Sequence, residues 1–470
     1  MKLMKKIIFS FVFTAVSASQ ALTIDEYIAT AKAKNPLFRS YELSVEATQS
    51  KYDSSEIELA PLLTAGYLKS KDKSLPSSMA TGEREMDQYS LGLAKKFFTG
   101  TSVKLEALNN DFKNQGPLIP SLDQFSTGSV GISISQSLWK DFLGAGTRNK
   151  IERQKAASQI EMTAAELQRR GFLIQLESDY WDYAVAIEDL KLKKSNLERA
   201  QKMESWTAKR VSNGISDRAD LMNIKALASL RALQLQTAEE ELKTQQIKFR
   251  ENLGLSADEK LPEISGNMSQ SRTYISDLVK KSNVVSLESE VAKYEAATKA
   301  YVADEVKDSL KPDLTVFGSY ATTSFNREKS EAVKKITDSD YPKSTVGVNF
   351  SWAFETDAKS GLRESALKES MAAKLKLEKK SALSAVGWTE LVRKYQMTQT
   401  NVKTLEQIAS FQRERSKAEQ DKFLKGRTVT ASVVTAETDA AEAEVTLLKA
   451  KAGLKKLEAS GLLYVSANEK

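Results

Sequence analysis

The sequence VGISISQSLWKDFLGAGTRNKI, residues 130–151, combines two periodicities. Its first nine residues alternate, with Ile132 and Ile134 on one side of an extended chain and serines on the other, which is typical of a half-buried strand. The stretch that follows, from Gly144 to Lys209, contains no proline. As a single helix it would extend roughly 100 Å at 1.5 Å per residue. The sequence therefore predicts a strand that leads directly into an unusually long helix.

A second junction of this kind lies in the other half of the chain. VGVNFSWAF (346–354) alternates strictly, and a long helical stretch follows from about Gly361. Both long helices reach a helix-stop signal, at Asn213-Gly214 and at Lys425-Gly426, and then return to about 254 and 457. Apolar residues in 429–457 recur at steps of three and four, which is typical of a coiled-coil seam.

Other segments suggest further strands and shorter helices. YSLGLAKKF (89–97) and TSVKLEALN (101–109) alternate and flank a turn at Phe98-Thr99-Gly100, which predicts a hairpin. Strands are also expected after Pro61 and Pro312, and helices over 24–59 and 274–310. We expect the polar segments 70–86, 112–126 and 322–343 to be connections between strands.

The two halves repeat. Pro61-Leu62-Leu63-Thr64 corresponds to Pro312-Asp313-Leu314-Thr315, and Val130-Gly131 to Val346-Gly347. The first half holds roughly 35 more residues between its opening and closing strands, and the extra hairpin accounts for them. We interpret the chain as a tandem repeat, with a first structural repeat at 22–262, a linker at 263–272 and a second repeat at 273–470.

The N-terminus has the features of a secretory signal peptide over residues 1–21. Three lysines precede the apolar run 7–16, and Ser19-Gln20-Ala21 is a small-residue cleavage site. An N-terminal membrane anchor is the alternative, although the run is short for a helical span. Removal of the three lysines lowers the formal net charge from +7 to +4, too little to argue for nucleic acid.

The composition argues against most enzyme classes. The chain has no Cys and no His, which excludes disulfides, thiol nucleophiles, Ser-His-Asp triads and the usual zinc sites. It also lacks the glycine-rich phosphate loop, so we predict no catalytic residues, no cofactor and no metal site. The composition still allows an enzyme whose catalytic groups are carboxylates alone. However, the pair Asp25-Glu26 lies in the first turn of a predicted helix, where the helix dipole favours acidic residues.

In order, spacing and duplication, several segments resemble the TolC-like outer-membrane efflux proteins. They are the opening helix 22–38, the entry strands 60–67 and 311–320, the return strands with their helix starts 130–151 and 346–365, the helix turns 210–226 and 423–438, and FRENLGL at 249–255. The resemblance covers nearly the whole chain after residue 21.

This resemblance implies a mainly α fold with membrane β structure. Three protomers would form one β-barrel in the outer membrane, and the helical hairpins would form an α-helical barrel in the periplasm. A periplasmic adaptor and an inner-membrane transporter would dock on a chain that conducts passively, in a tripartite efflux pump or a type I secretion system. The alternative is a periplasmic coiled-coil adaptor or scaffold, although such proteins usually carry one hairpin rather than two.

The family usually contributes four strands per protomer. The hairpin at 89–109 would make six if it joins the wall, or it would fold outside the wall. In either case the apolar side of the strands faces lipid. The candidates for this role are Ile132, Ile134, Val346, Val348, Phe350 and Trp352.

The resemblance also points to the two helix turns as the periplasmic tip. Asp220 matches an acidic family position there, but its counterpart is Ser432, and Thr435 occupies a further acidic position. Each charge is equally compatible with an ordinary solvated helix end. The candidates for gating are Gly214, Asp217, Arg218, Asp220, Gly426, Arg427 and Ser432.

Overall fold

The structure is a computed structural model that describes residues 21–73, 82–117, 119–256, 258–264, 272–338, 341–354 and 356–466. Nearly all of the predicted signal peptide and of the predicted linker lies outside these residues. The chain forms two compact units. We call Ser44–Ala165 with Glu288–Leu383 the sheet unit, and Met1–Leu43, Glu166–Leu287 and Ser384–Lys470 the helical unit.

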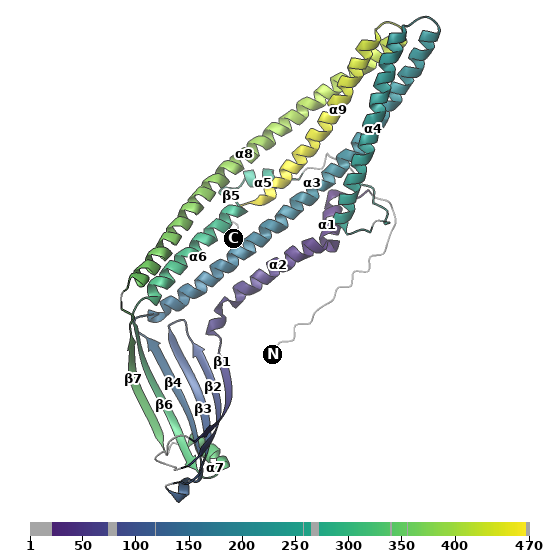
Figure 1. Ribbon diagram of the computed structural model, residues 1–470. Helices are drawn as coiled ribbons and strands as arrows, with labels where there is room; N and C mark the ends of the chain where they lie inside the picture. The colour runs from purple at the N-terminus through teal and green to yellow at the C-terminus, as the bar shows by residue number, and fades with distance from the viewer. Residues whose placement is uncertain are drawn as a thin grey trace. The chain divides into compact units, whose positions relative to one another are not determined.

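Six antiparallel strands form one sheet in the order β1-β2-β3-β4-β6-β7 (Figure 1). The hairpin of β2 and β3 lies between β1 and β4, so the strand count is six and the hairpin belongs to the sheet. β1 and β7 are the two edge strands. The bounds are β1 Leu62–Asp72, β2 Arg84–Lys96, β3 Thr101–Asn114, β4 Gln124–Ser137, β6 Asp313–Asn326 and β7 Pro342–Ser351.

One face of this sheet is apolar across every strand. The pairing Leu63–Leu93–Leu105–Ile132–Tyr320 runs through β1 to β6, and Ile134, Gly318 and Val346 form a parallel row through β4 to β7. These side chains are exposed, and Val346 reaches 83%. The opposite face carries small and polar residues, such as the row Thr64–Gly92–Glu106–Gly131–Ala321. The register thus places five of the lipid-facing candidates on one face, while Trp352 lies one residue beyond β7.

The sheet unit also contains helices that continue four of the strand ends. α2 (Pro36–Asp53) and the short η1 (Ser54–Leu59) lead into β1, and α6 (Leu287–Ser309) leads into β6. β4 continues into α3 (Ala145–Ser212), and β7 continues into α8 (Asp357–Leu424). β2 and β3 are joined only to each other at this end, through Phe97–Gly100. No described helix is long and apolar enough to cross a membrane.

The corner between β4 and α3 is built around the hairpin turn. Gly144 has φ +76°, and a Cβ placed there would lie 1.7 Å from the Phe98 carbonyl oxygen. Arg148 Nη1 donates to the same oxygen at 3.3 Å, and Lys96 pairs with Asp141 at 3.0 Å. Asp141 in turn accepts from the backbone N–H of Thr147 at 2.8 Å. The turn is therefore fixed to the start of the long helix.

The helical unit has an aromatic core. Tyr27 of α1 (Ile24–Lys34) stacks on Phe249 of α4 (Arg218–Leu253) at 4.6 Å and contacts Tyr180 of α3 at 5.4 Å. All three rings are buried. α9 (Thr430–Ala459) packs beside α4, and β5 (Val284–Ser286) pairs with β8 (Tyr464–Ser466).

The long helices agree with the sequence prediction to within a few residues at each end. The prediction of connections at 70–86, 112–126 and 322–343 is wrong in part, because β1 to β4 and β6 extend into these segments. The extensions are polar, yet they pair with one another, as Glu85 does with Lys113 across β2 and β3. The strand predicted over 346–354 instead begins at Pro342 and ends at Ser351. The β5–β8 pair was not predicted.

We expect Gly144→Ala to destabilise the sheet unit. The substitution forces a side chain into the left-handed region, which costs about 1–2 kcal/mol, and into contact with backbone at 1.7 Å. Thermal unfolding of the purified protein measures the loss. Gly361→Ala is the matched control, because a Cβ there meets nothing within 4 Å and alanine favours helix. Equal unfolding temperatures for the two variants would contradict the account of the corner.

Candidate functional site: the turn end of the two helical hairpins

The α3–α4 and α8–α9 turns use the same backbone device. Gly214 has φ +70° and Gly426 has φ +71°. In each turn the glycine N–H bonds to the carbonyl three residues back, and the next N–H bonds five residues back, as in Ile215 to Arg210 at 2.9 Å. This pattern is a Schellman motif, which favours glycine at its left-handed position. The sequence prediction of two glycine-dependent helix turns is confirmed.

Apolar side chains from four helices pack just behind the turns. Met203 of α3, Ile224 of α4, Phe423 of α8 and Val433 of α9 are buried against one another. Trp206 and Val434 cover them in part. The two hairpins therefore meet at their ends, which lie together in Figure 1.

Arg210 connects the two turns. Its guanidinium lies over the Trp206 ring at 4.6 Å and over the Phe423 ring at 6.0 Å, and it donates to the Phe423 carbonyl at 3.4 Å. A Cβ on Gly426 would lie 3.8 Å from this group. Sequence reasoning missed Arg210. Its position four residues after Trp206 on the same helix could have indicated the contact with that ring. The contact with Phe423, however, joins residues more than 200 positions apart in the sequence.

The predicted acidic candidates have local roles here. Asp217 is the N-cap of α4 and accepts from the Ala219 N–H at 3.4 Å. Asp220 accepts from the Ser216 hydroxyl at 2.9 Å, and this bond holds the pKa of Asp220 below its ordinary value. Thr430 of α9 also lowers the pKa, so Asp220 faces the second hairpin.

The remaining tip candidates contribute less to the packing. Arg218 and Arg427 are exposed on the two turns, as is Thr435 on α9. Ser432 is partly buried, and its N–H bonds to the Val429 carbonyl at 3.1 Å. The structure therefore brings Asp220 to the interface between the hairpins and leaves the two arginines in solvent.

A buried ionic network ties all four helices together farther from the turns. Glu437 of α9 is 5% exposed and accepts from Ser416 of α8 at 2.7 Å and from Arg199 of α3 at 3.1 Å. Arg231 of α4 is equally buried and donates to Thr438 at 3.3 Å. Burial lowers the pKa of Arg231, and Glu437 opposes this shift. Sequence analysis did not find Glu437, which lies inside a stripe of alanines.

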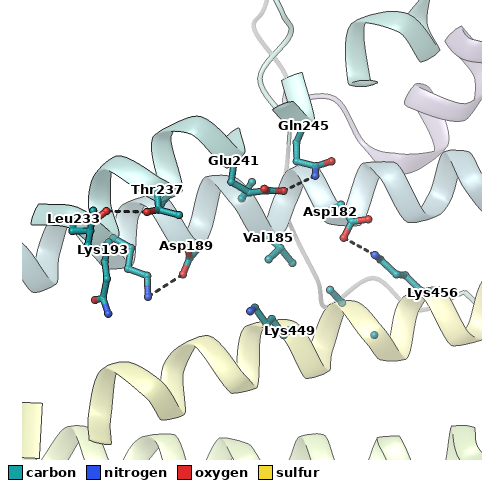
Figure 2. A pocket seen from close by; sticks show the side chains of 15 residues that line it. Asp182, Val185, Asp189, Lys193, Leu233, Thr237, Glu241, Gln245, Lys449 and Lys456 are labelled. Atoms are coloured by element: carbon teal, nitrogen blue, oxygen red, sulfur yellow. Dashed lines mark hydrogen bonds and ion pairs between the residues drawn. The ribbon is translucent and has the colours of Figure 1, made fainter. Parts of the chain in front are cut away.

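A surface groove of about 660 Å³ lies between α3, α4 and α9 (Figure 2). Two ion pairs lie on its walls: Lys456 contacts Asp182 at 2.5 Å, and Lys193 contacts Asp189 at 3.7 Å. The described residues contain no cluster of three acidic side chains that would hold a metal ion. The groove therefore resembles a helix-packing furrow more than a catalytic pocket.

Two acids are deeply buried at the other end of α9. Glu177 of α3 accepts from the Tyr274 hydroxyl at 3.1 Å and lies 3.9 Å from Arg272, and Glu458 accepts from the Ile275 N–H at 3.0 Å. Burial raises the pKa of both carboxyls, and the like charges of Asp25 and Glu458 raise the pKa of Glu177 further. Burial also raises the pKa of Tyr274 to about 12.

Comparison with known proteins identifies the fold. No protein-family profile and no curated protein matches the chain. Among solved structures, the outer-membrane channel OprN is 15% identical, with a TM-score of 0.64 over 94% of this chain and 89% of its own. The outer membrane protein VceC of Vibrio cholerae is 14% identical, with a TM-score of 0.65 over 93% and 95%.

The open state of the MtrE outer membrane channel of Neisseria gonorrhoeae aligns with a TM-score of 0.61 at 14% identity, over 94% of this chain and 87% of its own. The chain therefore has the fold of TolC-like outer-membrane channels, as the resemblance in sequence predicted. These structural neighbours are channel proteins and not enzymes.

We expect Arg210→Ala to loosen the junction of the two hairpins. A cation over an aromatic face contributes about 0.5–2 kcal/mol, and Arg210 lies over two rings. Hydrogen exchange should increase in 206–216 and in 423–430, on both hairpins. Arg218→Ala is the control, because this exposed arginine lies on the same turn. An increase confined to the α3–α4 turn would contradict a role in joining the hairpins.

The two buried acids predict a pH dependence of stability. Because their folded pKa values are raised above the ordinary 4.5, their contribution to stability is complete below that value and is lost as pH rises through the folded values. The double variant Glu177→Gln, Glu458→Gln should therefore show a smaller fall in unfolding temperature from pH 5 to pH 8. Glu240→Gln, at an exposed site, should leave the fall unchanged. An unchanged fall in the double variant would refute this assignment.

Proposed function

We propose that the chain is one subunit of a trimeric outer-membrane channel that passively conducts substrates from the periplasm to the exterior. The observation that carries this proposal is the six-stranded sheet with one continuous apolar face and two open edges, attached to long helical hairpins. The fold shared with outer-membrane channels over 94% of the chain supports it.

Oligomerisation follows from the physics of a lipid environment. Every backbone polar group in hydrocarbon needs a partner, so a sheet spans a membrane only as a closed barrel. About eight strands is the practical minimum for closure, and one chain has six. The open edges of β1 and β7 are thus proposed to pair between copies, which closes the wall.

The apolar face is proposed to contact the lipid. Val346, Val348 and Phe350 of β7 lie on this face, and Trp352 follows at the helical end. Tyr67 and Tyr89 pair midway along β1, where the apolar residues of this face give way to Lys69 and Asp87, with ring centroids 5.1 Å apart. Membrane barrels carry such aromatic residues at both interfaces. The face with Ser133 and Ser135 would then line a water-filled lumen.

The turn end of the helices is proposed to be the gate and the docking site. The chain would be exported by its signal peptide, with the sheet in the outer membrane and the helices in the periplasm. The exposed turns at Gly214 and Gly426 would contact a periplasmic adaptor. An inner-membrane transporter would complete a tripartite efflux pump or a type I secretion system, and substrate selection would rest with that transporter.

Opening would separate the two hairpins where Arg210 and Phe423 now meet. Asp220, which faces Thr430 across the junction, would separate with them. Ser432 and Thr435 carry no charge, so an acidic ring at those positions is not part of this gate. The proposed gate rests on cation–aromatic packing with one acid beside it.

A planar-bilayer recording of the purified chain without residues 1–21 tests the proposal. We expect discrete conductance from a trimer, with the oligomer mass measured on the same sample. If the trimer stays closed, trimming the turns near Gly214 and Gly426 should open it. A soluble monomer that neither inserts nor conducts would overturn the channel and favour the periplasmic scaffold.

A further inference from the structure

The β2–β3 hairpin adds wall without adding helices. Within the sheet unit, β1, β4, β6 and β7 each continue into a helical segment, whereas β2 and β3 are joined by the turn Phe97–Gly100. The sheet thus has six strands for four helix connections. The number of strands in the sheet and the number of helical segments connected to it are therefore set by different parts of the sequence.

The hairpin is fully integrated into the sheet. β2 pairs with β1 over eleven residues and β3 pairs with β4 over thirteen. Its turn is held by side chains of the β4–α3 corner: Gln136 Nε2 donates to the Thr99 carbonyl at 3.1 Å, and Arg148 donates to the Phe98 carbonyl. Its apolar residues Leu91, Leu93 and Leu105 continue the apolar face without a break.

We propose that this hairpin sets the circumference of the barrel, so that three chains close an eighteen-stranded wall. This inference rests on the proposed trimeric channel. At a strand spacing of about 4.8 Å and a tilt of about 40°, eighteen strands give a perimeter of roughly 110 Å, whereas twelve give roughly 75 Å. The hairpin would thus lengthen the perimeter of the wall by half.

The longer perimeter has a consequence for conduction. The backbone diameter becomes about 36 Å, compared with about 24 Å for twelve strands. Side chains facing the lumen occupy about 5 Å on each side, which leaves roughly 25 Å and 14 Å respectively. On this face lie small residues such as Gly92, Gly131 and Ser133, which keep the lumen open. The barrel is then not the narrow part of the conduit, and the size limit falls on the helix turns.

Cryo-electron microscopy of the full chain in lipid nanodiscs tests the inference directly. We expect eighteen strands in cross-section in a trimer. A variant that lacks 84–114 removes β2 and β3 and leaves β1 antiparallel to β4, as β6 is to β7. Its barrel should hold twelve strands, with a diameter smaller by a factor of about 1.5. Arg148→Ala weakens the anchor of the turn but keeps all strands, so its barrel should keep the full width.

The possible results distinguish a failure of the inference from a failure of the proposed function. A full-length trimer with twelve strands in the wall, or with the hairpin folded away from it, would overturn the inference and leave the channel intact. A chain that forms no oligomer in lipid would overturn both. If the deletion variant does not fold, the strand count of the full-length trimer alone decides.

Discussion

The two open edges of the six-stranded sheet are the constraint on which the rest of the molecule depends. β1 and β7 present backbone N–H and C=O groups that other strands must satisfy, and the apolar face beside them is exposed in the single chain. In water such a sheet would aggregate; in a closed wall surrounded by lipid both features become stabilising. The predicted signal peptide and the alternating strands both agree with the proposed location of the sheet in a membrane.

Glycine positions fix the geometry at both ends of α3. At its start, Gly144 allows the Phe98 carbonyl to approach the helix, which attaches the hairpin turn to the corner. At its end, Gly214 closes a Schellman motif that reverses the chain into α4. A Cβ on Gly214 would meet nothing within 4 Å, so only the positive φ requires glycine there. At Gly144, both the positive φ and the lack of space for a side chain require glycine. Glycine is therefore required at the start of this helix by a close contact as well as by its conformation, and at the turn by its conformation alone.

The sequence predicted most of this fold because its signals are local. Strict alternation and long proline-free stretches identify strands and helices without knowledge of partners. Strand ends were predicted poorly because Lys71, Glu85 and Lys113 are polar and suggested connections, although cross-strand pairs hold them in the sheet. The site was predicted only in part. Its glycine turns were predicted because they are local signals in the sequence. Arg210 and Glu437 act through partners on other helices that no spacing reveals.

Rearranging the proposed barrel wall would cost more free energy than rearranging the helix turns. Separating two strands breaks a whole ladder of backbone hydrogen bonds, and in hydrocarbon no water replaces them. The hairpins are joined at their turns by one small apolar cluster and one arginine over two rings, at a water-exposed end. Such contacts amount to a few kcal/mol, and water satisfies the groups they release. In the proposed channel, a conformational change that opens a path would therefore be expected at the turns, while the wall would keep the width that its strand number sets.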